Sequence, residues 1–144
     1  RVHAGFMAYR DWSVANPAEF NLCFGEPLPG YAAPEGGSTT EAFQAVFAPL
    51  LSALATAHAA GLVVSPELPD DLAPLGIVAE VMLPDSPPGL VTLAFETWSR
   101  VHGITALEVN DHLSYLGFDT RPLAEFQVRR MVDHLMGRAD TIAP

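Results

Sequence analysis

The segment 87–115 constrains the fold more than any other part of the sequence, because apolar side chains recur along it on two faces of a helix. One face carries Val91, Phe95, Trp98, His102, Ala106, Val109 and Leu113. A second face carries Leu90, Ala94, Thr97, Val101 and Ile104. A helix that is apolar on two faces must be covered twice. In a chain of 144 residues, we expect the second cover to be another copy of the same chain.

Helical spacing also dominates elsewhere, and no stretch shows the apolar-polar alternation of a strand. The sequence therefore predicts an all-α fold that forms one domain over residues 1–144. About six helices are expected, over residues 1–15, 18–24, 38–60, 68–84, 87–115 and 120–137.

Capping and breaking residues set the expected helix boundaries. Ser38 and Glu41 have the spacing of a capping box, and Pro49 predicts a kink within the helix that follows. Gly61 and Gly137 are placed to end helices. The Pro- and Gly-rich residues 26–37 read as a loop. The first helix is periodic from its first residue and has no capping residue, so further sequence is expected upstream.

Composition excludes several classes of function. Seven basic residues, all arginine, face 17 acidic ones, which gives a formal charge of −10 and no basic stripe for a phosphate backbone. No uninterrupted apolar run reaches the roughly 18 residues of a membrane span, so no membrane partner is expected. The single cysteine, Cys23, cannot form an intramolecular disulfide, which fits the cytoplasm, and we expect its thiol to be buried and inert.

Candidate catalytic and metal sites are sparse. His102 could be a ligand or a general base, but it fits better as a core histidine that packs beside Trp98 and bonds a backbone carbonyl. Glu108 and His112 could hold an ion across one helical turn, although no established metal-binding pattern surrounds them. No nucleophile or phosphate-loop motif is present, so we expect no catalytic residue, no cofactor and no metal site.

Gly103 and the aromatic residues suggest close packing and a possible cavity. Gly103 lacks a Cβ, which favours a tight helix crossing at that point. Many aromatic side chains surround the predicted kinked helix, and they suit either a filled core or a cavity for an apolar small molecule.

Two stretches, YRDWSVANPAEFNLCFG at 9–25 and FETWSRVHG at 95–103, resemble the ligand-binding domain of TetR-family transcriptional regulators. The resemblance is to the subgroup named WHG after a tryptophan and a His-Gly pair. The matching positions are Tyr9, Arg10, Trp12, Asn16, Pro17, Phe20, Leu22, Phe24, Gly25, Trp98, His102 and Gly103.

This resemblance implies a homodimer with a four-helix interface, a small-molecule effector, and operator DNA bound by a helix-turn-helix domain upstream of this chain. The expected pocket for an apolar effector is lined by Phe6, Phe43, Phe47, Leu50, Met82, Phe95, Trp98 and His102. The expected dimer interface contains Val101, Gly103, Ile104, Val128, Met131 and Leu135. Two alternatives stay open: a helical enzyme or cofactor-binding protein that uses the aromatic cavity, and an adaptor that only dimerises.

Overall fold

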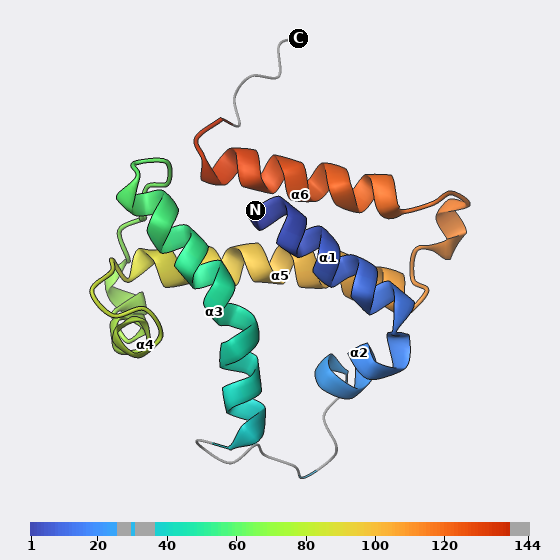
Figure 1. The fold of residues 1–144 in the computed structure, drawn as a ribbon, viewed down its shortest axis with the longest axis horizontal. Helices are drawn as coiled ribbons and strands as arrows, with labels where there is room; N and C mark the ends of the chain where they lie inside the picture. Colours follow the sequence, from blue (N-terminus) through green and yellow to red (C-terminus); the bar gives the residue numbers. More distant parts are fainter. Residues whose placement is uncertain (26–29, 31–36, 139–144) are drawn as a thin grey trace. The chain divides into compact units, whose positions relative to one another are not determined.

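The computed structural model describes residues 1–25, 30 and 37–138, and these residues contain helices and no strand (Figure 1). The prediction of an all-α fold with six helices is confirmed. The helices are α1 (Val2–Ala15), α2 (Pro17–Phe24), α3 (Ser38–Ala59), α4 (Leu75–Met82), α5 (Gly89–Val109) and α6 (Arg121–Leu135). Most of the loop predicted at 26–37 lies outside the described residues.

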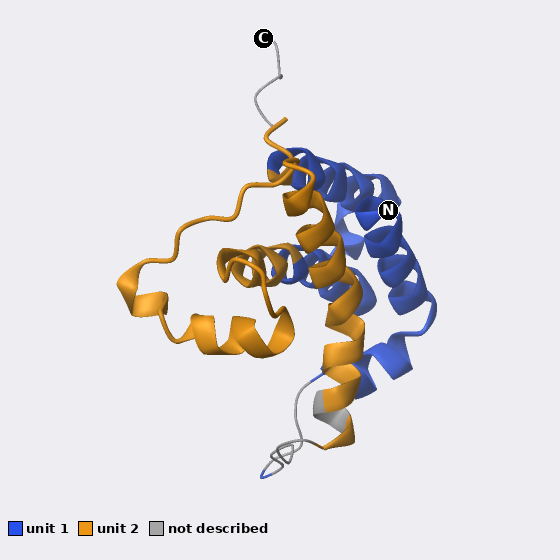
Figure 2. Cartoon of the chain, turned by 60° about the vertical axis from the view of Figure 1, so that its left-hand side comes forward, with its two compact units in different colours: residues 1–31, 98–134 blue, residues 32–97, 135–144 orange. Residues whose placement is uncertain are grey.

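The chain divides into two compact units (Figure 2). Unit 1 comprises residues 1–31 and 98–134, and therefore α1, α2, the second half of α5 and almost all of α6. Unit 2 comprises residues 32–97 and 135–144, and therefore α3, α4 and the first half of α5. The single helix α5 thus contributes residues to both units.

In unit 1, α1 buries one face at helical spacing. Phe6, Met7, Arg10 and Ser13 are the buried residues of α1, and they recur every three or four positions. The buried residues of the other helices in this unit are Phe20, Val101, Ile104, Thr105, Ala124, Val128 and Met131. An arginine inside this core needs a partner, and that partner defines the candidate site described below.

In unit 2, the core is built from one face of α3 and the first half of α5. The buried side chains are Phe47, Leu50, Leu51, Leu54, Val63, Ala79, Leu90, Val91, Ala94 and Thr97. Within the described residues, the segment Glu41–Ala59 is the one helix long and apolar enough to cross a membrane, with a mean hydropathy of 1.3. Core helices of ordinary globular domains have the same length and composition.

Several predicted helix boundaries are confirmed. Gly61 and Gly137 follow α3 and α6 with φ of 70° and 64°, the left-handed conformation that a glycine adopts without strain. Pro49 lies inside α3, which stays one helix, and Figure 1 shows that the axis of α3 changes direction partway along. Because Pro49 has no N–H to donate, a bend at this point has a direct cause.

Other predicted boundaries are wrong. Gly37, not Ser38, is the N-cap of α3, and no side chain caps that helix. The helix predicted from residue 68 begins at Leu75, because residues 70–72 form a separate 3-10 turn before Pro74. The helix predicted to reach residue 115 ends at Val109, and Asp111 then adopts a φ of 58°. Cys23 is exposed, whereas a buried thiol was predicted.

Candidate functional site

An aromatic cluster in unit 1 surrounds the ring of His102. The Tyr9 hydroxyl of α1 lies 2.8 Å from Nδ1 of this histidine. The rings of Trp98 and Phe20 each stack on the imidazole with a centroid separation of 5.4 Å, and Phe24 meets it edge-on at 5.2 Å. The prediction that His102 packs beside Trp98 is confirmed, but its hydrogen-bond partner is a tyrosine hydroxyl and not a backbone carbonyl.

Burial keeps both polar members of this pair neutral. It raises the pKa of Tyr9 to about 12, and it lowers the pKa of His102. A protonated phenol can donate to the lone pair on Nδ1 of a neutral imidazole, which places the remaining ring proton on Nε2. The pair therefore acts as a hydrogen bond between α1 and α5 rather than as an acid-base couple.

Next to Tyr9 on α1, Arg10 forms a buried ion pair with Glu108, which lies six residues after His102 on α5. Nε of Arg10 donates to Oε2 of Glu108 over 2.8 Å, and Nη2 donates to Oε1, so the contact has two parallel hydrogen bonds. The two side chains are only 9% and 2% exposed. Thr120, directly before α6, donates a further hydrogen bond to Oε1 over 2.6 Å. Glu108 thus connects three elements of unit 1.

A more exposed pair extends this network to α6. Asp11 accepts hydrogen bonds from Arg121 over 2.8 Å and from Arg10 over 2.9 Å. These two guanidinium groups lower the pKa of the Asp11 carboxyl, and the contact from Arg121 has the larger effect. Asp11 is therefore ionised at neutral pH and holds the start of α6 to α1.

These contacts fix the position of α1 and leave little for catalysis. His102 is enclosed by aromatic rings, and the Glu108 carboxylate is already bound by Arg10 and Thr120. Among the described residues, no group of three His, Cys, Asp or Glu side chains could hold a metal ion. We therefore interpret the site as a structural anchor that ties α1 to α5 and α6.

The residues expected to bind an effector divide between the two units. In unit 2, Phe47 of α3 is buried, lies 5.5 Å from Phe43 and lies 5.1 Å from Phe95 of α5 between ring centroids. In the same unit, Leu50 is buried and Met82 is half-buried. Unit 1 holds the other three: Phe6, which is buried, and the stacked pair Trp98 and His102.

The residues expected at a dimer interface differ from one another in how far their own chain buries them. The side chains of Val101, Ile104, Val128 and Met131 are buried by their own chain, so the second apolar face of α5 does not need a partner to cover it. Leu135 is half-buried, and Gly103 is exposed. Apart from its chain neighbours and the backbone of α5, a Cβ added to Gly103 would meet no described atom within 4 Å, so no other helix in the described residues crosses α5 closely there.

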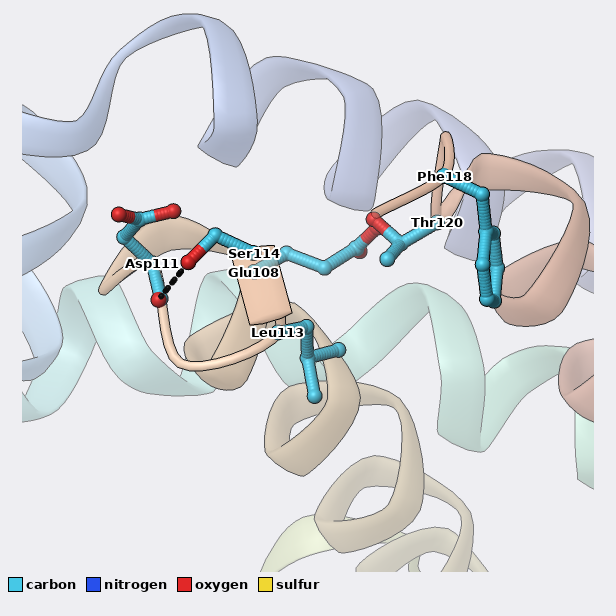
Figure 3. Close-up of a pocket in the computed structure, with 6 residues that line it drawn as sticks. All are labelled: Glu108, Asp111, Leu113, Ser114, Phe118 and Thr120. Carbon is cyan, nitrogen blue, oxygen red and sulfur yellow. Dashed lines mark hydrogen bonds between the residues drawn. The ribbon is translucent and has the colours of Figure 1, made fainter. Parts of the chain in front are cut away.

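A small pocket opens beside Glu108 in unit 1 (Figure 3). It has a volume of about 110 Å³ and lies between the end of α5 and the start of α6. Its lining residues are Glu108, Asp111, Leu113, Ser114, Phe118 and Thr120. Sites for drug-sized ligands are typically about 300–1,000 Å³, so this pocket is too small to hold such an effector.

Comparison with known proteins identifies the family. Residues 2–131 match the family described as tetracyclin repressor-like, C-terminal domain. The chain belongs to the TetR family. Among curated proteins, it is similar to the HTH-type transcriptional regulators Rv1816 of Mycobacterium tuberculosis and Mb1846 of Mycobacterium bovis, at 35% identity over 108 residues in each case. Each alignment covers 71% of this chain and 44% of the relative, so the chain spans less than half the length of these regulators. No solved structure matches the chain.

The geometry gives the TetR-like motif residues a physical role. Both stretches that carry the resemblance meet at His102, since Tyr9, Phe20 and Phe24 come from the first and Trp98 from the second. From the sequence, Arg10 was identified only as a position of the TetR-like motif, and no contact between Arg10 and Glu108 was predicted. Residues 98 positions apart can be paired only by the tertiary fold, so no local pattern could have found this contact.

Proposed function

We propose that this TetR-like domain is the regulatory part of a ligand-responsive transcriptional repressor. In this proposal it binds an apolar small-molecule effector, forms a homodimer, and controls a helix-turn-helix domain that precedes α1 in the complete protein. The main support is the family match over residues 2–131 together with the anchoring of α1 to α5. Operator DNA would be contacted only by the upstream domain, because this chain has a formal charge of −10. Such a regulator works in the cytoplasm, where its operator is.

Helix α5 provides a continuous path from the proposed effector site to α1. Phe95 belongs to the aromatic group with Phe43 and Phe47, and it lies two turns before His102 on the same helix. An apolar effector that packs against Phe95 would favour one position of α5. His102 and Glu108 would then transmit that position to Tyr9 and Arg10 of α1. The effector must bind this position of α5 more tightly than the position that α5 takes in the DNA-bound regulator. Without that difference in affinity, effector binding would not change the affinity for DNA.

The proposed dimer uses surface that its own chain leaves uncovered. On α5, Gly103 and Leu107 lie four residues apart on one face, and Leu107 is 41% exposed. On α6, Phe126 is 56% exposed and Arg130 lies over its ring at 5.9 Å. Gly103 would let a helix of the second copy approach the backbone of α5 closely. In this proposal the exposed residues form the contact surface in place of the buried Val101, Ile104, Val128 and Met131.

A thermal-shift screen against apolar metabolites and drugs tests the effector proposal. A compound present at about 100 times its dissociation constant adds about 2.7 kcal/mol to the free energy of unfolding. The response should be lost in Phe95→Ala and retained in Phe118→Ala, which removes an exposed ring of unit 1 instead. In the complete regulator, the same compound should lower the affinity for operator DNA. Equal responses in the two variants would contradict the proposed site.

The enzyme alternative has no supporting observation in the described residues. It depended on His102 or Glu108 acting on a ligand, and both side chains are engaged in contacts with α1. The family to which the chain belongs consists of transcription regulators. We therefore propose no second function.

A further inference from the structure

Positive charge is absent from a long stretch of this sequence. No lysine or arginine occurs between Arg10 and Arg100, although acidic residues are spread through that interval. As a result, the described part of unit 2 contains Arg138 as its single arginine, beside seven acidic residues: Glu41, Glu67, Asp70, Asp71, Glu80, Asp85 and Glu96. Unit 1 carries the other six arginines. The two units therefore differ strongly in electrostatic character.

Helix α4 of unit 2 presents an uncovered apolar face. Ile77 and Val81 are 75% and 73% exposed and lie one helical turn apart, with Val78 beside them at 39%. On the opposite side, Ala79 is buried and Leu75 and Met82 are half-buried. Apart from Glu80, the side chains of α4 are apolar, but they are covered on one side only, and exposed apolar patches mark interaction surfaces.

Unpaired carboxylates border this face in the sequence. Asp70 and Asp71 precede α4, Glu80 lies within it, and Asp85 follows it. All four residues are exposed, and none of them forms an ion pair within the described part of the chain. Branched aliphatic side chains and uncompensated negative charge therefore occur together on α4, where Glu80 lies three residues after Ile77, and the three aspartates add negative charge in the adjoining segments of the sequence.

The apolar side chains and the negative charge together indicate which kind of partner can bind the exposed face of α4. A second copy of α4 would bring the same carboxylates against these four, and like charges across an interface oppose association. Nucleic acid and an anionic lipid surface are repelled for the same reason. An amphipathic helix with an apolar stripe flanked by Lys or Arg satisfies both features at once.

We propose that the exposed face of α4 is a docking surface for a basic amphipathic helix of another protein. The apolar stripe of that helix packs on Ile77, Val78 and Val81, and its cations pair with Glu80 and the neighbouring aspartates. This interaction would give the regulator a protein partner in addition to its effector and operator. It does not depend on effector binding, because Phe95 and the aromatic group are not part of the α4 face.

Binding of designed peptides to the chain of residues 1–144 tests the proposal. The probe is a fluorescent helical peptide with leucines at i, i+3, i+4 and i+7 spacing and lysines at the flanking positions. A second peptide has glutamate in place of lysine, and a third has the lysine composition in scrambled order. Fluorescence anisotropy should show binding of the first peptide, weak binding of the scrambled one and none of the glutamate one.

Variants of the chain locate the binding site. The double substitution Ile77→Ser with Val81→Ser should weaken binding by about tenfold or more, as expected for central apolar contacts. Glu80→Gln should weaken binding less and reduce its dependence on salt. Leu22→Ser is the matched control, because it removes an 87% exposed apolar side chain from unit 1 and should leave binding unchanged. Circular dichroism confirms that each variant is folded.

Three results would overturn the proposal. The scrambled peptide could bind as tightly as the amphipathic one, which would indicate charge attraction without a docking surface. The Ile77→Ser and Val81→Ser variant could bind as tightly as the original chain, which would place the peptide elsewhere. Sedimentation could show that this double substitution abolishes self-association, which would assign the α4 face to a second copy of the chain.

Discussion

At the scale of single residues, buried polar side chains hold α1 in place. Arg10 and Glu108 are nearly inaccessible, and each is the main partner of the other. Removing one charge from such a pair leaves the other desolvated and unpaired, which costs far more than the loss of a surface ion pair. The contact is therefore a sensitive point for the stability of unit 1.

Glu108→Gln should lower the free energy of unfolding by about 3–5 kcal/mol, because the Arg10 charge stays buried without a counter-charge. Glu125→Gln is the control, since Glu125 pairs with Arg121 and Arg129 at the surface over 3.8 and 3.4 Å. Its cost should be below about 1 kcal/mol. Urea denaturation measures both. Similar losses in the two variants would show that the Arg10–Glu108 pair is not an important anchor.

His102 should make the stability of the domain depend on pH. Its pKa in the folded chain lies below the ordinary 6.5 because burial disfavours the imidazolium. The unfolded chain therefore takes up a proton first as the pH falls through 6.5. The contribution of neutral His102 to the free energy of unfolding is therefore fully present above pH 6.5. It is lost as the pH falls from 6.5 towards the lower pKa of His102 in the folded chain.

Comparing urea denaturation at about pH 7.5 and about pH 5.5 tests this dependence. His102→Asn should reduce the difference between the two conditions. His112→Asn, at an exposed position, should keep the difference seen in the original chain. If His102→Asn and the original chain show the same difference, another group is responsible for the pH dependence.

At the scale of secondary structure, two glycines of α5 have opposite surroundings. A Cβ on Gly89 would lie 2.1 Å from the carbonyl oxygen of Pro66 and 2.6 Å from the Ser65 hydroxyl. Outside the backbone of α5 and its chain neighbours, a Cβ on Gly103 would meet no atom of the described residues within 4 Å. Gly89 therefore allows the segment before α4 to pass close to the start of α5, whereas Gly103 has no such role inside the chain.

Gly89→Ala should destabilise the domain by about 1–3 kcal/mol, because the backbone of Pro66 must move. Gly103→Ala should instead stabilise the helix by about 0.5–1 kcal/mol in the monomer, since alanine is the better helix former. Chemical denaturation at low protein concentration separates the two effects. A destabilising Gly103→Ala under these conditions would mean that this glycine is needed inside the chain.

The helices themselves could be predicted from the sequence because their signals are local. Apolar periodicity located all six, and Gly61 and Gly137 marked two ends correctly. The start of α4 was missed because Pro69 with two aspartates suits a 3-10 turn as well as an α-helix. The second apolar face of α5 was assigned to a partner because periodicity does not show which helices of the same chain will cover it. The aromatic pocket residues were proposed from the sequence and remain a prediction.

At the scale of the whole chain, the most informative property is the uneven distribution of charge. In unit 1, the arginines and the acidic residues are similar in number. In the described part of unit 2, all charged residues except Arg138 are acidic. Two copies of the chain should therefore associate through unit 1, where Arg130 and the exposed Phe126 lie, rather than through unit 2.

Leu107→Glu should shift the chain from dimer to monomer in analytical ultracentrifugation, because it places a carboxylate in the proposed contact surface. Val64→Glu is the control, since it adds the same charge at an 83% exposed position of unit 2. Both positions are exposed, so neither variant should lose its fold. A chain that is monomeric without any substitution would contradict the dimer proposal itself.

Because no lysine or arginine lies between Arg10 and Arg100, limited proteolysis with trypsin gives no information on that part of the protein. The protease cleaves after lysine or arginine, so it finds no peptide bond to cut across α2, α3, α4 or the first half of α5, however often those helices open. Tryptic digestion will therefore leave residues 11–100 as one fragment, and local opening of unit 2 has to be followed with a protease that cleaves after apolar or acidic residues.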